Sequence, residues 1–254
     1  MTYPPLLFIH GAANGAWVWE FWRREMKALG WDANVLDLRG HGGSMPVDFS
    51  AVTMEDYVAD VESVTPQIEA RLGRCPVIIG WSMGGLVAMM YAARHPATPA
   101  LVLLEPSPPE QVQGRGTAAE LSKLPIAAIG PEAYGLYPRD RERSRAALAG
   151  LNDAELSAVL AYSAGAQESG LARRQRKAGI IVGAGAIRCP VLVVYGEAGD
   201  HFTPEMSRRL ALFLGAETRS VADAGHWALV YSQHLVNETA PGLDEWLRRV
   251  LAGE

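Results

Sequence analysis

The sequence predicts an α/β fold with a mostly parallel central sheet, helices on both faces and an inserted helical cap. Short apolar runs alternate with helical patterns along most of the chain, which is typical of the α/β class. The apolar runs lack the polar alternation of a half-exposed strand, as expected for strands covered on both faces. The alternation then stops between residues 107 and 187, where we expect the cap.

Six runs have the length and composition of strands. Continuous Val, Ile and Leu stretches of this length favour a buried parallel sheet. They are Leu6 to Ile9, Ala33 to Leu38, Val77 to Ile79, Leu101 to Leu104, Val191 to Tyr195 and Glu217 to Val221.

Helical patterns fill the intervals between these runs. The segment Thr53-Met54-Glu55-Asp56 has the form of a capping box, in which a threonine and an acidic residue three positions later satisfy each other's backbone amides. The predicted helices are Phe21 to Leu29, Thr53 to Leu72, Leu86 to Arg94, Pro204 to Leu214 and Leu243 to Leu251.

Pro, Gly, Ala and charged residues replace strand patterns between Ser107 and Ile187, with one amphipathic helix expected at Asp153 to Tyr162. An excursion from the carboxyl end of one strand would overhang the sheet edge where α/β proteins bind ligands. We therefore divide the chain into a core of residues 1–106 and 188–254 and a cap of residues 107–187. Two ordinary crossover helices with long loops are the alternative.

Composition excludes several classes of protein. With 254 residues, 49% of them apolar, the chain can bury a large core. A net charge of −5 argues against binding nucleic acid, and we interpret the basic cluster at 173–177 as a solvated helix face. Leu6 to Ile9 is too short for a signal peptide or a membrane span, so we expect a cytoplasmic protein without a membrane partner.

Cofactor and metal sites are not indicated. No spaced His or Cys cluster suggests a metal, and Gly183-Ala184-Gly185 lacks the third glycine and the preceding strand of a dinucleotide site. We expect Cys75 and Cys189 to be free thiols, because cysteines in the cytosol usually stay reduced. The oligomeric state is not encoded in any motif.

Ser82 is the candidate nucleophile. It lies in Gly80-Trp81-Ser82-Met83-Gly84, between an apolar strand and a helical run. A G-x-S-x-G turn of this kind holds the serine in a strained conformation that exposes its hydroxyl, and small residues are required around it. Gly85 would allow the helix to approach the strand closely.

A serine needs a base, and the base needs an acid that fixes its tautomer. His226 follows the last strand pattern, so its ring can reach the same sheet edge as Ser82. We favour Asp200 as the acid, because it lies in the loop after the strand that ends at Tyr195 and completes the order Ser, Asp, His. Glu197 and Glu105 are alternatives, and Glu105 ends the strand that follows the nucleophile.

Backbone amides should stabilise the oxyanion that forms on attack. Met83, at a helix N-terminus, and Ala12, in the loop after the first strand, are the predicted donors. His10 is interpreted as a residue that orders this loop. Aromatic residues that could form an apolar substrate pocket are Trp17, Trp81, Trp227, Tyr134, Tyr137 and Tyr162, each of which could equally be core packing.

Together these motifs resemble the α/β-hydrolase superfamily, and in particular its serine esterase-like branch. His10-Gly11, Asp37-Leu38-Arg39-Gly40-His41-Gly42-Gly43-Ser44, the Ser82 turn, Asp200 and Gly225-His226 occur in the order usual for that family. The resemblance implies an α/β-hydrolase fold. It also implies that Asp37, Arg39 and His41 build a loop, so His41 is not expected to be the base.

The expected function is hydrolysis of a small carboxylic ester through an acyl-enzyme, without a cofactor. The same triad could instead perform perhydrolysis of the haloperoxidase type, or cleave a lactone, a carbon–carbon bond or a cyanohydrin. A small-molecule receptor on the same fold, without turnover, is the alternative from another class.

Overall fold

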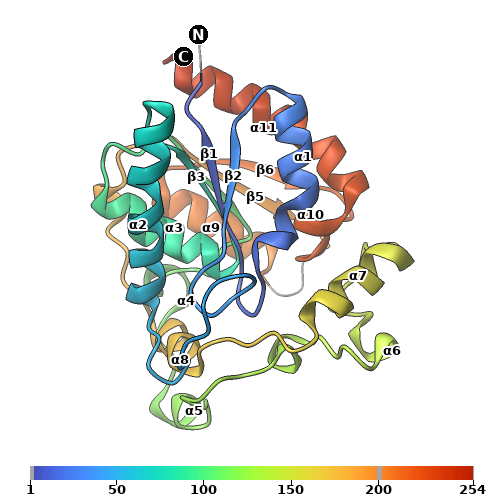
Figure 1. Cartoon of the computed structure of the whole chain (residues 1–254). Coiled ribbons are helices and arrows are strands. Elements are labelled where there is room, and N and C mark those ends of the chain that lie inside the picture. Colours follow the sequence, from blue (N-terminus) through green and yellow to red (C-terminus); the bar gives the residue numbers. More distant parts are fainter. Residues whose placement is uncertain (1–2, 199–201, 254) are drawn as a thin grey trace.

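The computed structural model describes residues 3–198 and 202–253, which form one parallel sheet covered by helices on both faces (Figure 1). The described strands have the spatial order β2-β1-β3-β4-β5-β6 and pair in parallel throughout. The predicted α/β fold is therefore confirmed. The strands are β1 (Leu6–Ile9), β2 (Ala33–Leu36), β3 (Val77–Trp81), β4 (Leu101–Leu104), β5 (Val191–Gly196) and β6 (Glu217–Val221).

Four of the five predicted helices begin close to their predicted positions, and the exception is the last one. Thr53 caps α2 (Met54–Leu72). Its side chain accepts from the Asp56 amide and the Asp56 side chain accepts from the Thr53 amide, which confirms the predicted capping box. The helices of the sheet region are η1 (Ala16–Trp19), α1 (Glu20–Ala28), α2 (Met54–Leu72), α3 (Met83–Arg94), α9 (Pro204–Leu214), α10 (Ala228–Tyr231) and α11 (Gln233–Ala252).

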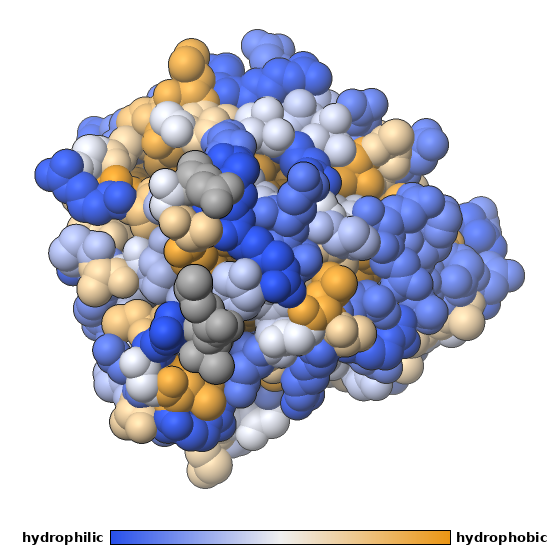
Figure 2. Space-filling model, turned by 90° about the horizontal axis from the view of Figure 1, so that it is seen from above, coloured by the Kyte–Doolittle hydropathy of each residue, from blue (hydrophilic) through white to orange (hydrophobic). Residues whose placement is uncertain are grey.

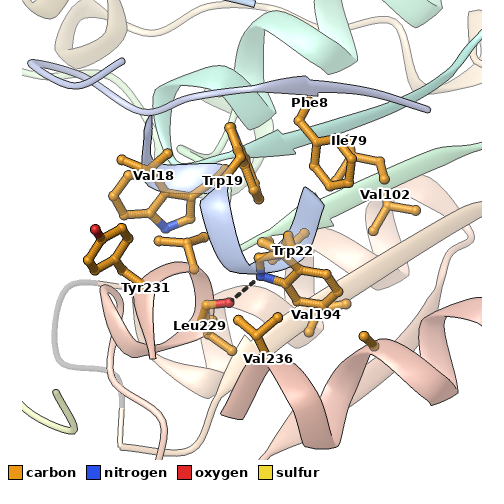
Figure 3. Close-up of a cluster of buried hydrophobic side chains, with 14 of the residues drawn as sticks. Phe8, Val18, Trp19, Trp22, Ile79, Val102, Val194, Leu229, Tyr231 and Val236 are labelled. Carbon is orange, nitrogen blue, oxygen red and sulfur yellow. Dashed lines mark hydrogen bonds between the residues drawn. The ribbon is translucent and has the colours of Figure 1, made fainter. Parts of the chain in front are cut away.

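Two buried clusters, one on each face, hold the helices against the sheet. Because side chains alternate along a strand, Phe8 and Ile79 face the cluster that contains Trp19 and Trp22, whereas Ile9 faces the opposite cluster with α2, α3 and α9. Figure 3 shows the first cluster, in which the Trp22 indole Nε1–H donates to the Leu229 carbonyl at 2.8 Å. Both faces of β1, β3, β4 and β5 are thus buried, as their continuous apolar runs predict.

Two elements near the C-terminus depart from the simple patterns: β6 has the predicted bounds but not the expected composition, and α11 is longer than predicted. Strand β6 pairs only with β5 and lies at the sheet edge, where Glu217, Thr218 and Ser220 are exposed, so it is not a continuous apolar run. Helix α11 begins at Gln233 and includes Pro241, a residue that usually ends or kinks a helix and that concealed its first half.

The chain between β4 and β5 is helical and irregular, without a strand among its described residues. It lies below the carboxyl ends of the strands in Figure 1, at the end of the molecule opposite the two termini. Its helices are α4 (Glu110–Gln113), α5 (Ala118–Ser122), η2 (Pro131–Tyr134), α6 (Arg141–Ser144), α7 (Asp153–Ser163), α8 (Gly170–Ala178) and η3 (Ala184–Ala186).

The end of the molecule where the two termini lie has both hydrophobic and hydrophilic residues on its surface. In Figure 2, which views the end where the termini lie, hydrophobic residues are scattered among hydrophilic ones and do not form one continuous patch. Of the described helices, none is both long and apolar enough to cross a membrane. Cys75 and Cys189 are free thiols.

Candidate active site

Ser82 stands at the turn between β3 and α3 in the predicted strained conformation. Its φ is 55° and its ψ is −122°, a combination that non-glycine residues rarely adopt. The Ser82 carbonyl accepts from the amides of Gly85 at 3.0 Å and Ser107 at 2.7 Å, and the Ser82 amide donates to Leu104 at 3.2 Å. The turn is therefore fixed by both α3 and the end of β4.

Close backbone contacts explain the glycines around Ser82. A Cβ at Gly80 would lie 2.4 Å from the Gly84 carbonyl oxygen, and one at Gly84 would lie 2.3 Å from the Ile9 carbonyl oxygen. A Cβ at Gly85 would meet the Pro106 side chain at 2.4 Å. Only glycine lets α3 start this close to β1 and β3. The glycines of the G-x-S-x-G pattern are therefore needed here for steric reasons, as in a nucleophile turn.

His226 and Glu105 form a hydrogen-bonded pair. The Nδ1 atom of His226 lies 2.7 Å from Oε2 of Glu105, whose side chain is fully buried. The second carboxylate oxygen, Oε1, accepts from the Gly196 amide at 2.8 Å. Glu105 directly follows β4 and has a φ of 34°, so a strained backbone turns its side chain toward the histidine.

This geometry favours Glu105, one of the two alternatives to Asp200, as the acid. A neutral imidazole carries one proton on Nδ1 when Nε2 acts as the base, and the Glu105 carboxylate is the group positioned to accept it. Asp200 lies outside the described residues, and the side chain of the other alternative, Glu197, is exposed. Among the described residues, the carboxylate that bonds His226 comes from the residue directly after β4, the strand next to the serine strand.

The Trp81 side chain both hydrogen-bonds to His226 and packs against its ring. Its Nε1–H donates to the His226 carbonyl at 3.2 Å, and the two rings pack with centroids 4.9 Å apart. Phe202 packs edge-on against the same imidazole at 5.3 Å. The ring is therefore held by aromatic packing as well as by Glu105.

Ser82 and His226 line one cavity of about 490 Å³. This volume lies within the range of small-molecule sites, about 300–1,000 Å³. Its wall joins the sheet edge to the segment between β4 and β5. The described lining residues are Ala12, Asn14, Trp81, Ser82, Ala133, Tyr134, Gly135, Tyr137, Arg143, Ala146, Ala147, His226 and Trp227.

The two predicted oxyanion donors both lie close to Ser82. Ala12 lines the cavity, and a Cβ at the preceding Gly11 would lie 3.0 Å from the Ser82 Cβ, so this loop passes directly beside the serine. Met83 is the first residue of α3, where backbone amides have no partner within the helix. The Met83 side chain is fully buried in the second cluster, which leaves its backbone as the group near Ser82.

His10 orders the loop after β1 as a neutral residue. The imidazole is fully buried; its Nδ1 lies 2.7 Å from the Gly11 carbonyl, and its Nε2 accepts from the Leu38 amide at 3.1 Å. Burial, together with the nearby His41, lowers the pKa of His10 to about 4. This arrangement agrees with the interpretation of His10 as a loop-ordering residue.

A buried carboxylate that the motifs did not indicate, Glu168, joins this loop to the segment between β4 and β5. It accepts from Tyr57 Oη at 2.6 Å and from the Ala13 amide at 3.3 Å, and its Oε2 lies 3.4 Å from His41 Nε2. Burial would raise the pKa of Glu168, but His41, Arg176 and Tyr57 together hold it well below its usual range.

The basic cluster at 173–177 is only partly the solvated face that its composition predicts. Arg176 is buried, where it faces Glu168, and its guanidinium donates to Tyr134 Oη at 3.2 Å. No sequence motif marks Glu168 or Arg176. The only available sign was an acidic and a basic residue eight positions apart within one segment.

The structure divides the aromatic residues expected around the substrate. Trp81, Trp227, Tyr134 and Tyr137 line the cavity with Ser82. Trp17 and Tyr162 do not; they stack on each other with ring centroids 4.6 Å apart and line a neighbouring cavity with Asp37 and His41. Asp37 itself accepts from the Ala16 and Gly43 amides, so it orders the loop there, as the family resemblance implies. The described residues contain no group of three potential metal ligands.

The sequence matches the alpha/beta hydrolase family over residues 6–239, and the chain belongs to that family. A thermophilic esterase from Thermogutta terrifontis has a similar structure, with a TM-score of 0.70 at 22% identity, over 98% of this chain and 91% of that one. At this identity the likeness shows the fold alone.

Two curated relatives match over shorter stretches. A Saccharomyces cerevisiae protein named probable alcohol acetyltransferase is 37% identical over 94 residues, which cover 37% of this chain and 27% of that protein. Pimeloyl-(acyl-carrier protein) methyl ester esterase from Salmonella heidelberg is 35% identical over 104 residues, which cover 41% of this chain and 37% of the esterase. The chain thus matches about a third of the length of these relatives.

Proposed function

We propose that this protein is a serine hydrolase that cleaves small carboxylic esters through an acyl-enzyme. The observation that carries the proposal is the hydrogen bond of 2.7 Å between His226 Nδ1 and the buried Glu105, next to a cavity that Ser82 and His226 both line. The name of the Salmonella relative, a methyl ester esterase, agrees with it.

In the first half of the reaction, Glu105 keeps the His226 proton on Nδ1, so Nε2 can accept the proton of the Ser82 hydroxyl. Ser82 Oγ forms a bond to the ester carbonyl carbon, and the carbonyl electrons move onto oxygen. The Ala12 and Met83 amides stabilise this oxyanion. When the carbonyl re-forms, the bond to the alkoxy group breaks and the alcohol leaves with the proton from His226.

In the second half, a water molecule attacks the Ser82 acyl ester while His226 accepts its proton. Collapse of the second tetrahedral intermediate breaks the bond to Ser82 Oγ, which regains the proton, and releases the carboxylic acid. In this scheme residues 107–187 act as the cap, because Tyr134, Tyr137 and Ala147 from this segment form one wall of the cavity.

Hydrolysis of p-nitrophenyl acetate and butyrate tests the proposal. Wild-type protein should release p-nitrophenol and be labelled by a fluorophosphonate, and Ser82→Ala should abolish both. Ser122→Ala, at an exposed serine of α5, is the matched control and should retain both. If Ser82→Ala kept its label, or if wild-type protein turned over no ester, the proposal would be wrong, and the second result would favour a receptor.

A further inference from the structure

Arg143 is the one permanently charged residue among the described residues that line the Ser82 cavity. It lies in the short helix α6, within the segment between β4 and β5. The other lining residues are neutral or aromatic, apart from the titratable His226. A single cation in such a wall is a group that distinguishes one ester from another.

The guanidinium of Arg143 lies over an aromatic ring. Its Cζ is 3.7 Å from the ring centroid of Tyr137, which lines the same cavity. Stacking of this kind engages the face of the guanidinium and leaves its N–H groups, which point outward in the plane, for another partner.

No carboxylate among the described residues lies within ion-pair distance of the Arg143 guanidinium. Of the nearby acidic residues, Glu142 pairs with Arg145 and Asp153 pairs with Arg141, while Asp140 accepts from the Arg143 backbone amide and not from its guanidinium. The neighbouring Arg141 and Arg145 are thus each paired with a carboxylate, whereas Arg143, which is exposed at the cavity wall, has none within ion-pair distance among the described residues.

A second feature adds positive potential to the same wall. The guanidinium of Arg173 lies 5.3 Å from the ring centroid of Tyr134, another lining residue, and donates to the Ala133 carbonyl at 3.3 Å. Arg176, behind Tyr134, is opposed by the buried Glu168 and contributes less. An anionic group at this wall would therefore be attracted by Arg143 and Arg173 together.

We propose that the substrate is an ester that carries a carboxylate, which Arg143 binds while Ser82 attacks the ester carbonyl. The planar guanidinium matches a carboxylate with two parallel N–H···O bonds. The apolar surfaces of Trp81, Trp227 and Ala147 accommodate the carbon chain between the two ends. This inference rests on the proposed ester hydrolysis and adds the class of substrate to it.

The experiment compares esters that differ in one charge. Monomethyl esters of dicarboxylic acids, from succinate to pimelate, are assayed beside the methyl esters of the corresponding monoamides, in which a neutral amide replaces the carboxylate. A second pair carries the charge on the alcohol side: 4-acetoxybutanoate beside 4-acetoxybutanamide. Release of acid is followed by mass spectrometry, and the measured quantity is the ratio of kcat/KM values, anionic over neutral.

The expected ratio in wild-type protein is about ten at low salt for at least one pair, and it should fall as salt is added. Arg143→Gln should bring the ratio to about one. Arg143→Lys keeps the charge but loses the two parallel N–H donors of the guanidinium, so it should give an intermediate ratio. Arg145→Gln removes the same charge from a neighbouring surface residue outside the cavity and should leave the ratio unchanged.

The outcomes separate the two proposals. Hydrolysis with a ratio near one for every pair, or a preference that Arg143→Gln and Arg143→Lys both retain, would overturn the role of Arg143 and leave ester hydrolysis in place. A preference lost equally in Arg145→Gln would also overturn it, because the effect would then be one of net charge. If no ester of either charge were hydrolysed, the proposed function itself would fail.

Discussion

Glu105 Oε2 lies 2.7 Å from His226 Nδ1, although the two residues are 121 positions apart in the chain. The contact exists because β4 ends beside β3 in the sheet, which places a residue after β4 next to the Ser82 turn. The carboxylate has no exposed surface and is also held by the Gly196 amide, so its position is fixed before any substrate binds.

Replacement of the acid should distinguish Glu105 from Asp200. Glu105→Gln keeps the shape but presents an amide to Nδ1, which destabilises the imidazolium and permits the wrong tautomer. We expect kcat to fall about 10³-fold to 10⁴-fold, with Asp200→Asn causing a much smaller loss. Steady-state kinetics with p-nitrophenyl butyrate measures both. The reverse ranking would return the role of acid to Asp200.

A methyl group at Gly11 should damage turnover by displacing the oxyanion loop. Its Cβ would lie 2.9 Å from Trp81 Cε3 and 3.0 Å from the Ser82 Cβ, and Trp81 is packed too tightly to yield. We expect Gly11→Ala to lower kcat about 100-fold, the loss typical of one oxyanion donor. Gly185→Ala, where an added Cβ meets nothing within 4 Å, is the control. Equal activity in the two variants would contradict the prediction.

Loss of the Glu168 charge should lower the stability of the folded protein. Glu168→Gln would leave the buried Arg176 without its opposing carboxylate and weaken the bonds to Tyr57 and Ala13. We expect the free energy of unfolding to fall by about 3 kcal/mol, measured by chemical denaturation. The exposed Glu205→Gln is the control. A stability equal to that of wild-type protein would show that this network contributes little.

The stability of the protein should fall as the pH drops from about 6.5 to about 4, in part because of His10. The pKa of His10 is lowered to about 4 from an ordinary value of 6.5, so in this window the unfolded chain binds a proton that the folded protein does not. The difference corresponds to about 3 kcal/mol. This loss of stability is complete below about pH 4 and absent above about pH 6.5.

Denaturation at several pH values checks the role of His10. His10→Gln should show a flatter dependence of the unfolding free energy on pH across this window, whereas the exposed His234→Gln should keep the wild-type slope. A His10→Gln variant whose slope matched that of wild-type protein would assign the pH dependence to other groups.

The local elements were largely predictable. Continuous apolar runs identified the buried strands β1, β3, β4 and β5, because strands covered on both faces need apolar residues at every position. Strand β6 also has its predicted bounds, although this edge strand is exposed and not continuously apolar. The first half of α11 was missed, because Pro241 is tolerated inside the helix.

The candidate site was predictable where the chemistry depends on local backbone. The turn at Ser82 and the loop at Gly11 require small neighbours, and those glycines are visible in the sequence. The partner of His226 depends on which strand ends lie side by side, and order along the chain does not specify this. For the same reason the sequence did not predict that Trp17 and Tyr162 line the neighbouring cavity, or that Glu168 bonds the loop after β1.

The amino-acid sequence alone determined the strained serine turn, the parallel sheet and the histidine after the last strand, because each depends on residue types within a few positions. Tertiary structure alone decided that Glu105 binds His226, that Glu168 joins the loop after β1 to the segment between β4 and β5, and that Arg143 faces the cavity. Those contacts join segments far apart in the chain, and only the packing of β4 beside β3 and of the helical segment over the sheet edge brings them together.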